Sequence, residues 1–456
     1  MDRRDRGALS LYANDLWGAG YARRACLDRT NPSRIRYCVM PKPVYVRVSD
    51  LRGIQRLAND ATVGLTDLVE AMHHTVLRTP GILGKSPAGR TAGITGFVYK
   101  SVRGITRLVG GGVDALLGIL APLADRPSSD EREAILAALN GIFGDYLVAS
   151  GNPLAVPMQL RKGGVPVAVN RRALAAAFRD PGRSIVVLVH GLCMNDLQWA
   201  RKGHDHGAVL AHELGYAPVY LHYNTGLHVS TNGRQFGALM EMLLRQWPEP
   251  VERLTIIGHS MGGLVARSAC HYAARAGHAW PKRVGELIFL GTPHLGAPLE
   301  RAGAWVDFLL AISPYTAPFA RLGMVRSAGI KDLRHGYVRD EDWQTHPAAA
   351  GRSARASLPL PDGVRCYAIA ASKQERANSS GGRIRGDGLV PVSSALGQGR
   401  HASLNLGLPQ AQRWVGYGMG HLDLLSRIAV YEHIRDWLME VPGQFGHVVD
   451  TGTGLG

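Results

Sequence analysis

The segment from Leu254 to Leu264 reads LTIIGHSMGGL, in which a strand-like apolar run leads through G-x-S-x-G into a helix-like run. A strand that turns this sharply into a helix pushes the serine hydroxyl out above the sheet edge. Small residues at Gly258 and Gly262 relieve the crowding at such a turn, and the amides that open the helix favour developing negative charge. The segment therefore predicts Ser260 as a nucleophile. The alternative is an ordinary glycine-rich turn, since the chain has 56 glycines.

Beyond residue 150, short apolar runs alternate with helical stretches. The expected strands are two short ones within Met158–Val169 and then Ile185–Val189, Val219–His222, Leu254–Ile257, Leu287–Leu290, Val364–Ala370 and Arg413–Tyr417. Helices are expected between them, for example at His206–Leu214, Gly233–Gln246 and Gly262–Ala276. This alternation predicts the α/β class, with a mainly parallel sheet covered by helices on both faces.

A nucleophilic serine needs donors for the oxyanion that forms on the substrate. The amide of Met261, directly after the serine, is one candidate. The strand Ile185–Val189 ends in His-Gly, and the amide of Leu192 in that loop is the second candidate. His190 itself is expected to be structural more often than catalytic. It remains a candidate to line the substrate site, together with Tyr223, which begins the strand-end sequence Tyr-Asn-Thr-Gly.

The serine also needs a base and an acid that orients the base, in the chain order serine, acid, histidine. Asp387 lies in the loop sequence GDGLVP, and His421 follows a predicted strand within GHLDLL. The alternatives are an ordinary Asp-Gly turn for Asp387 and a surface loop for His421. His401 competes less well because no comparable strand end precedes it. Asp423 is too close to His421 for an easy return of its side chain and is expected to be a local cap.

Five segments, VLVHGL, IIGHSMGGLVAR, FLGTPHLGAP, GDGLVP and GHLDLL, resemble in this order the α/β-hydrolase superfamily. Within it they are similar to lipase-like esterases related to GPI inositol-deacylase and to bacterial triacylglycerol lipases. The resemblance covers about Ser184 to Leu438. It implies an α/β-hydrolase fold with no cofactor. It also implies roles for five residues: a triad of Ser260, Asp387 and His421, and oxyanion donors at Leu192 and Met261.

The rest of the chain divides into an addition and a tail. Residues 1–150 are predicted to be an N-terminal helical extension, irregular up to residue 50. Its helices are expected at Asp50–Arg78, at Ile94–Ala124 and from Ser128 to about Val148. The resemblance implies no role for this extension. Residues 151–442 are predicted to be the catalytic domain, and residues 443–456 a flexible tail.

An aromatic stretch after the loop Gly291–Pro298 predicts a cap over the active site at about residues 300–325. Trp305 and Phe308 within it are candidate substrate-binding residues. Enzymes of this class often insert a lid or an acyl pocket at such a position. The alternative is that these aromatic side chains belong to an ordinary core.

The formal net charge is +16, and 44 of the 52 basic residues are arginine. The charge is spread along the chain without a long basic run, so we expect a solvated basic surface and no nucleic-acid partner. At most this charge favours anionic lipid, and the apolar face of residues 94–124 could contact the hydrolase domain, a membrane or a hydrophobic granule.

Neither a metal nor an exported location is expected. The five cysteines are odd in number and lack a C-x-x-C pattern, and the sequence Gly203-His-Asp-His206 fits a helix start better than a metal site. No secretory signal peptide and no confident transmembrane segment is seen. We therefore expect a cytoplasmic protein, and the alternative is an exported protein with one disulfide bridge. The sequence does not indicate an oligomeric state.

These observations favour a serine hydrolase that cleaves carboxylic esters, from lipids or other acyl compounds, through an acyl-enzyme. The same triad could instead serve an intracellular polyester depolymerase, a thioesterase or an amidase. From a different class, the chain could be a non-catalytic interaction protein on a hydrolase scaffold. The sequence distinguishes neither the acyl chain length nor the natural substrate.

Overall fold

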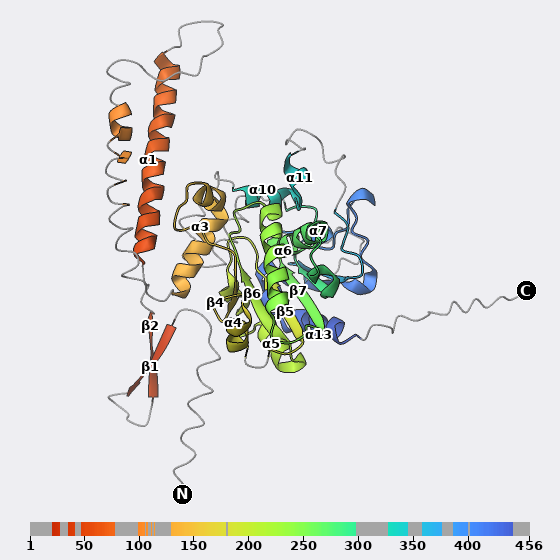
Figure 1. Cartoon of the computed structure of the whole chain (residues 1–456). Coiled ribbons are helices and arrows are strands. Elements are labelled where there is room, and N and C mark those ends of the chain that lie inside the picture. The colour runs from red at the N-terminus through yellow and green to blue at the C-terminus, as the bar shows by residue number, and fades with distance from the viewer. Residues whose placement is uncertain are drawn as a thin grey trace, which may run out of the picture.

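An eight-stranded sheet forms the centre of the computed structural model, which describes residues 21–27, 35–41, 47–77, 99–104, 106–107, 111, 114, 129–178, 181–297, 327–344, 358–375, 386–399 and 402–440 (Figure 1). Its strands are β3 (Gln159–Lys162), β4 (Val165–Val167), β5 (Ser184–Val189), β6 (Ala217–His222), β7 (Arg253–His259), β8 (Val284–Leu290), β9 (Arg365–Ser372) and β10 (Arg413–Tyr417). The order across the sheet is β10-β9-β8-β7-β5-β6-β3-β4. All neighbours from β10 to β6 are parallel, whereas β3 is antiparallel to both of its neighbours.

Burial explains why the central strands read as continuous apolar runs. Every residue from Ile185 to Val189 in β5 is completely buried, and so are Leu287 to Leu290 in β8. A parallel strand covered on both faces has no solvent side, so its sequence does not alternate. The six strands expected between Ile185 and Tyr417 all form, and the sequence Met158–Val169 supplies the antiparallel pair β3 and β4.

Helices cover both faces of the sheet. The helices of this part of the chain are α4 (Arg171–Ala177), α5 (His206–Leu214), α6 (Val229–Gln246), α7 (Met261–Arg275), α10 (Ala328–His335), α11 (Asp340–Gln344), α12 (Val392–Ala395) and α13 (Ile428–Met439). Short 3₁₀ turns form at η2 (Asp196–Trp199), η3 (Trp280–Arg283), η6 (Ala402–Leu404), η7 (Gln410–Gln412) and η8 (His421–Leu425). The crossover from β5 to β6 runs in the opposite direction along the sheet to those from β6 to β7 and β8. Right-handed crossovers therefore place α5 on one face and α6 and α7 on the other. The hydroxyl of Tyr431 in α13 donates to Glu213 in α5 at 2.6 Å, which joins these two helices.

The N-terminal region is helical only in part. Helix α1 (Val48–Leu77) and helix α3 (Asp130–Ala149) form where helices were expected, and parts of the helix expected at Ile94–Ala124 are described. The expectation that residues 1–50 are irregular is wrong in one respect. Strands β1 (Tyr21–Leu27) and β2 (Ile35–Pro41) pair in antiparallel register as a separate two-stranded sheet. The two strands are neighbours in the chain, with Leu27 opposite Ile35, and the adjacent Arg23 and Arg24 interrupt the alternation that would predict a strand.

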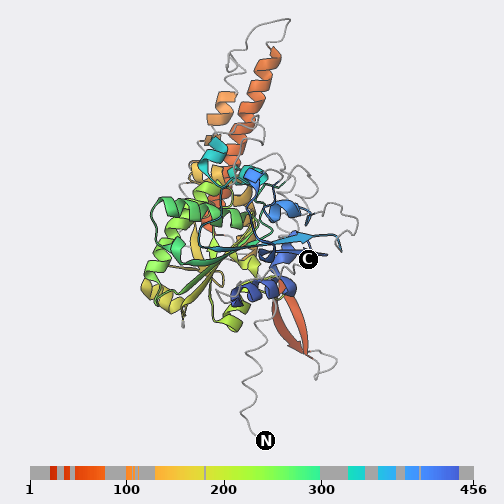
Figure 2. The same cartoon turned by 90° about the vertical axis from the view of Figure 1, so that its right-hand side faces the viewer.

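Helix α3 lies between α1 and the sheet (Figure 1), and α1 extends away from the sheet (Figure 2). The side chain of Ile142 belongs to the main core, whereas Leu136, Leu139 and Leu147 form a second cluster against which Leu57 of α1 packs. Because α3 is apolar on both of these sides, it joins the two cores. We therefore propose that the catalytic unit begins with α3 rather than at residue 151.

Several expectations fall outside the described residues. These are the cap at residues 300–325 with Trp305 and Phe308, His401, and the tail at 443–456. Among the helices that the structure describes, none combines the length and the apolar composition needed to cross a lipid bilayer.

The position of α3 predicts how truncation acts. A chain that starts at residue 126 should keep a cooperative unfolding transition, because it retains α3. A chain that starts at residue 151 should be less stable or insoluble, because the partners of Ile142 and Leu147 are then exposed. Burial of each such side chain stabilises by roughly 1.5–3 kcal/mol. Urea unfolding of both chains measures the difference, and equal midpoints would contradict the assignment of α3 to the catalytic unit.

Buried histidines predict acid sensitivity. Burial lowers the pKa of His190 to about 3 and of His206 to about 4, and it holds the pKa values of His259 and His294 well below the usual range. In the unfolded chain a histidine has a pKa of about 6.5. The unfolded state therefore takes up protons below this pH that the native state does not bind, and stability present above pH 6.5 is lost as the pH falls.

Each of these histidines should contribute at most about 1.4 kcal/mol of destabilisation per pH unit below pH 6.5. Denaturation midpoints between pH 7.5 and 5, together with calorimetric proton uptake on unfolding, measure the effect. A midpoint that stays flat between pH 6.5 and 5 would show that these side chains are not buried as neutral groups.

Candidate active site

Ser260 sits at the sharp turn between β7 and α7. Its backbone has φ 53° and ψ −121°, a conformation that costs energy for any residue with a side chain. The amide of Ser260 donates to the carbonyl oxygen of Leu290 at the end of β8, at 2.8 Å. Tertiary structure therefore holds the strained residue in place, at the carboxyl ends of the parallel strands.

The glycines around Ser260 are required by close backbone approach. A Cβ atom at Gly262 would collide with the carbonyl oxygen of Val189 in β5, and one at Gly258 would lie 2.5 Å from the amide nitrogen of Gly263. Such separations are far below van der Waals contact. The prediction that small residues at positions 258 and 262 relieve crowding is therefore confirmed.

The structure brings His421 and Asp387 together. Nδ1 of His421 lies 2.6 Å from Oδ2 of Asp387, and both side chains are buried. The other carboxylate oxygen of Asp387 accepts hydrogen bonds from the amides of Leu389 (2.9 Å) and Val390 (2.8 Å). An ionised carboxylate can only accept, so Nδ1 of His421 carries the proton and Nε2 is the nitrogen that can receive one.

The ring of His421 lies beside the turn that carries Ser260. A Cβ at Gly291, the residue after Leu290, would lie 3.1 Å from Cε1 of His421. Nε2 of the neighbouring His259 lies 3.2 Å from the backbone oxygen of His421, and the two ring centroids are 4.8 Å apart. A carbonyl can only accept, so Nε2 of His259 is the donor. His421 is thus fixed through both its ring and its backbone.

The carboxylate of Asp423 binds groups other than the ring of His421. Its Oδ2 accepts from the amide of Gly420 at 3.0 Å, and its Oδ1 forms an ion pair with Lys202 at 2.8 Å. These contacts are those of a local cap, which was the expectation.

The loop after β5 approaches Ser260 directly. A Cβ at Gly191 would lie 3.1 Å from Cβ of Ser260, so the backbone that leads to Leu192 passes beside Ser260. The loop turns at Cys193, which has φ 59°, and the amide of Cys193 donates to Oγ1 of Thr225 at 3.1 Å. Met261 is the first residue of α7, and the first amides of a helix have no carbonyl partner within it.

His190 and Tyr223 lie behind this loop. Their rings stack at 4.5 Å, and the hydroxyl of Tyr223 donates to the carbonyl oxygen of His190 at 2.8 Å. Both side chains are buried. These contacts give Tyr223 and His190 a supporting position, and direct contact of either with a substrate stays a prediction. The role of Thr225 in holding the loop could not be assigned from the sequence, where it was only one part of a strand end.

No cluster of three or more metal-ligating side chains occurs among the described residues. Asp205, within the segment Gly203-His-Asp-His206, caps α5 by accepting from the amides of Gly207 (2.8 Å) and Ala208 (3.1 Å).

The chain is similar to known hydrolases. Residues 181–360 match the family model described as the PGAP1-like alpha/beta domain. No curated protein matches the chain. A lipase of Bacillus licheniformis in its mature form is 19% identical, with 62% of this chain and 99% of that chain covered and a TM-score of 0.37. An esterase of Pyrococcus furiosus is 15% identical, with 56% and 81% covered and a TM-score of 0.33.

These TM-scores are low, and the fold is instead identified by the sheet topology of this chain and the turn at Ser260. The sheet is parallel from β10 to β6, the next strand β3 is antiparallel to β6, and a serine occupies the strained turn between β7 and α7. The α/β-hydrolase fold that the sequence predicts is confirmed, and so is the resemblance to lipase-like esterases of that superfamily. The chain carries an α/β-hydrolase fold and, over residues 181–360, resembles the PGAP1-like alpha/beta domain family.

Proposed function

We propose that the protein is a serine hydrolase that cleaves carboxylic esters through an acyl-enzyme intermediate. The observation that carries this proposal is the buried Asp387–His421 pair beside the strained turn of Ser260. Nucleophile, base and orienting acid come from three separate loops at the carboxyl ends of β7, β9 and β10. A non-catalytic scaffold would not need this arrangement.

The proposed reaction uses each residue at a defined atom. The hydroxyl of Ser260 attacks the acyl carbonyl carbon while Nε2 of His421 takes its proton, and Asp387 stabilises the resulting imidazolium. The amides of Met261 and Leu192 donate to the oxyanion. His421 then returns the proton to the leaving alcohol. A water molecule, activated in the same way, releases the acid and restores Ser260.

We propose acyl esters, including lipid esters, as the substrate class. The hydrolase fold and the resemblance over residues 181–360 support this class. Contact with a membrane or a hydrophobic granule stays a prediction, because most of residues 94–124 lie outside the described part of the chain. On α1 the side chains of Leu51, Ile54, Leu65 and Val69 are exposed, which is compatible with such contact.

Replacement of the nucleophile should abolish turnover. Ser260→Ala is expected to lower the kcat for p-nitrophenyl acyl esters by at least about 10⁴-fold, because the covalent route is lost. A fluorophosphonate probe should label the wild type on the peptide that contains Ser260 and should not label the variant. A series of acyl chain lengths then separates esterase from lipase activity. Equal activity of the two proteins, or inactivity of both at all chain lengths, would refute the proposal.

The two nearby carboxylates should behave differently. Asp387→Asn should lower kcat by about 10⁴-fold, because the amide no longer holds the required tautomer of His421. Asp423→Asn is the matched control, and it should stay within a few fold of wild type because Asp423 binds Lys202 and Gly420 instead. Steady-state kinetics of both variants test the assignment. A larger loss in Asp423→Asn would reassign the orienting acid.

A further inference from the structure

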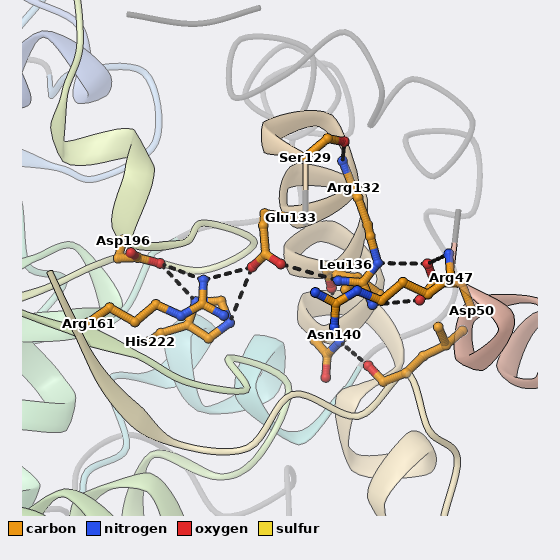
Figure 3. A network of polar contacts seen from close by, with 11 residues as sticks. Arg47, Asp50, Ser129, Arg132, Glu133, Leu136, Asn140, Arg161, Asp196 and His222 are labelled. Carbon is orange, nitrogen blue, oxygen red and sulfur yellow. Dashed lines mark hydrogen bonds and ion pairs between the residues drawn. The ribbon is translucent and has the colours of Figure 1, made fainter. Parts of the chain in front are cut away.

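Figure 3 shows a group of charged side chains in which Arg161 lies between Glu133 and Asp196. Nη1 of Arg161 in β3 is 2.8 Å from Oε2 of Glu133 in α3 and 3.1 Å from Oδ1 of Asp196. Nδ1 of His222, at the end of β6, lies 3.2 Å from the same oxygen of Asp196. We call Glu133, Arg161, Asp196 and His222 the buried ion cluster. It joins a helix, two strands and a loop.

The burial of this cluster carries a large energetic cost. All four residues are between 2% and 7% exposed. Transfer of an ion to the interior costs several kcal/mol even when it is paired, and well-packed apolar residues often stabilise as much or more. Burial alone would raise the pKa of Asp196, but the contact with His222 and the charge of Arg161 lower it below its usual value. A role in holding a particular geometry explains such a cluster better than stability does.

The geometry that the cluster holds is that of the loop beside the nucleophile. Asp196 is the first residue of η2 and follows Asn195, whose side chain caps that turn. This places Asp196 only four residues after Leu192. At the other end of the cluster, His222 precedes Tyr223, whose hydroxyl holds the carbonyl of His190. The cluster therefore ties together the loops that follow β5 and β6.

Helix α3 contacts both of these loops a second time. Its backbone at Gly141 is so close to Cys193 that a Cβ would collide with the cysteine sulfur. The carbonyl of Gly144 accepts from Nδ2 of Asn224 at 3.0 Å. Two glycines on one helix face allow this close approach, and Glu133 lies two turns earlier on the same helix.

We propose that Glu133 is a positioning residue for the oxyanion-binding loop 190–196. Through Arg161 it fixes Asp196, and the loop is thereby held with the amide of Leu192 beside Ser260. This inference rests on the proposed function for the role of that amide. The N-terminal region is then part of the catalytic apparatus, because Arg132, next to Glu133 on α3, also forms an ion pair with Asp50 of α1 at 2.6 Å.

The test compares Glu133→Gln with wild type in the full chain. The variant keeps the shape of the side chain and removes the charge that balances Arg161. We expect kcat to fall about 10–100-fold with KM within about threefold, since loss of one oxyanion donor costs about 10²–10³-fold and the loop is only displaced. The affinity of a boronic acid transition-state analogue should fall by the same factor as kcat/KM. Arg161→Lys, which retains the charge, should lose less activity than Arg161→Met.

Glu286→Gln is the matched control. Glu286 is equally buried in β8 and pairs with Arg253 at 2.8 Å and with Arg365, but it lies toward the opposite, amino ends of the strands. This control should lower the unfolding midpoint and leave kcat within about twofold of wild type. If both glutamine variants reduce kcat equally at equal stability, the loss is a general effect and the positioning role is refuted.

Amide hydrogen exchange of residues 190–196 tests the same role without turnover. Glu133→Gln should speed exchange in this loop, whereas Glu286→Gln should not. If wild type hydrolyses no ester, the proposed function fails, but faster exchange in Glu133→Gln alone still supports the coupling of α3 to the loop. Unchanged exchange in a folded Glu133→Gln variant would overturn it.

Discussion

The backbone turn at Ser260 depends on how closely α7 can approach β5. The first turn of α7 passes against the carbonyl of Val189, and no side chain at position 262 could be accommodated there. This contact brings Ser260, the start of α7 and the loop after β5 into one small volume. The sheet order follows the same requirement, since β5 and β7 must be direct neighbours for the approach to occur. Strain at Ser260 is tolerated because the surrounding strands and helix determine its backbone from several sides.

Local sequence patterns predicted the elements that bear the candidate triad. Ser260 and His421 each follow an apolar run and then glycine, whereas Asp387 lies in a glycine-rich loop well beyond the strand-like run Val364–Ala370. Chain order on the α/β-hydrolase fold then relates these signatures to one another. Those two rules predict the pairing of Asp387 with His421, and the two side chains lie 2.6 Å apart. Helix bounds were also predictable, as for α5, where a capping aspartate precedes the helix and a glycine with positive φ ends it.

Other features could not be predicted because their causes are tertiary. Nothing in the sequence near Glu133 distinguishes it from Glu131, its neighbour on the first turn of α3. Only packing shows that Glu133 meets Arg161 from a strand 28 residues away. Strands β1 and β2 are a second case, because they pair with each other although neither has the regular apolar alternation that predicts a strand. The division at residue 150 followed a change in sequence texture. The contacts of α3 join it to both cores, so the boundary drawn from sequence texture and the boundary drawn from packing differ at that helix.

The buried ion cluster explains why α3 belongs with the site rather than with the extension. An apolar contact surface favours close approach but prescribes no bond direction, because the hydrophobic effect depends on the area that is buried. Charged hydrogen bonds impose direction as well as distance. Arg161, between Glu133 and Asp196, therefore couples the position of α3 to the position of the loop. A loop that has to present an amide to a developing charge benefits from such a directional constraint, since preorganised donors need no rearrangement as the reaction proceeds. Burial of four ionisable groups costs energy, but their directional contacts favour one loop geometry over others. Helix α3 is the element that supplies this constraint.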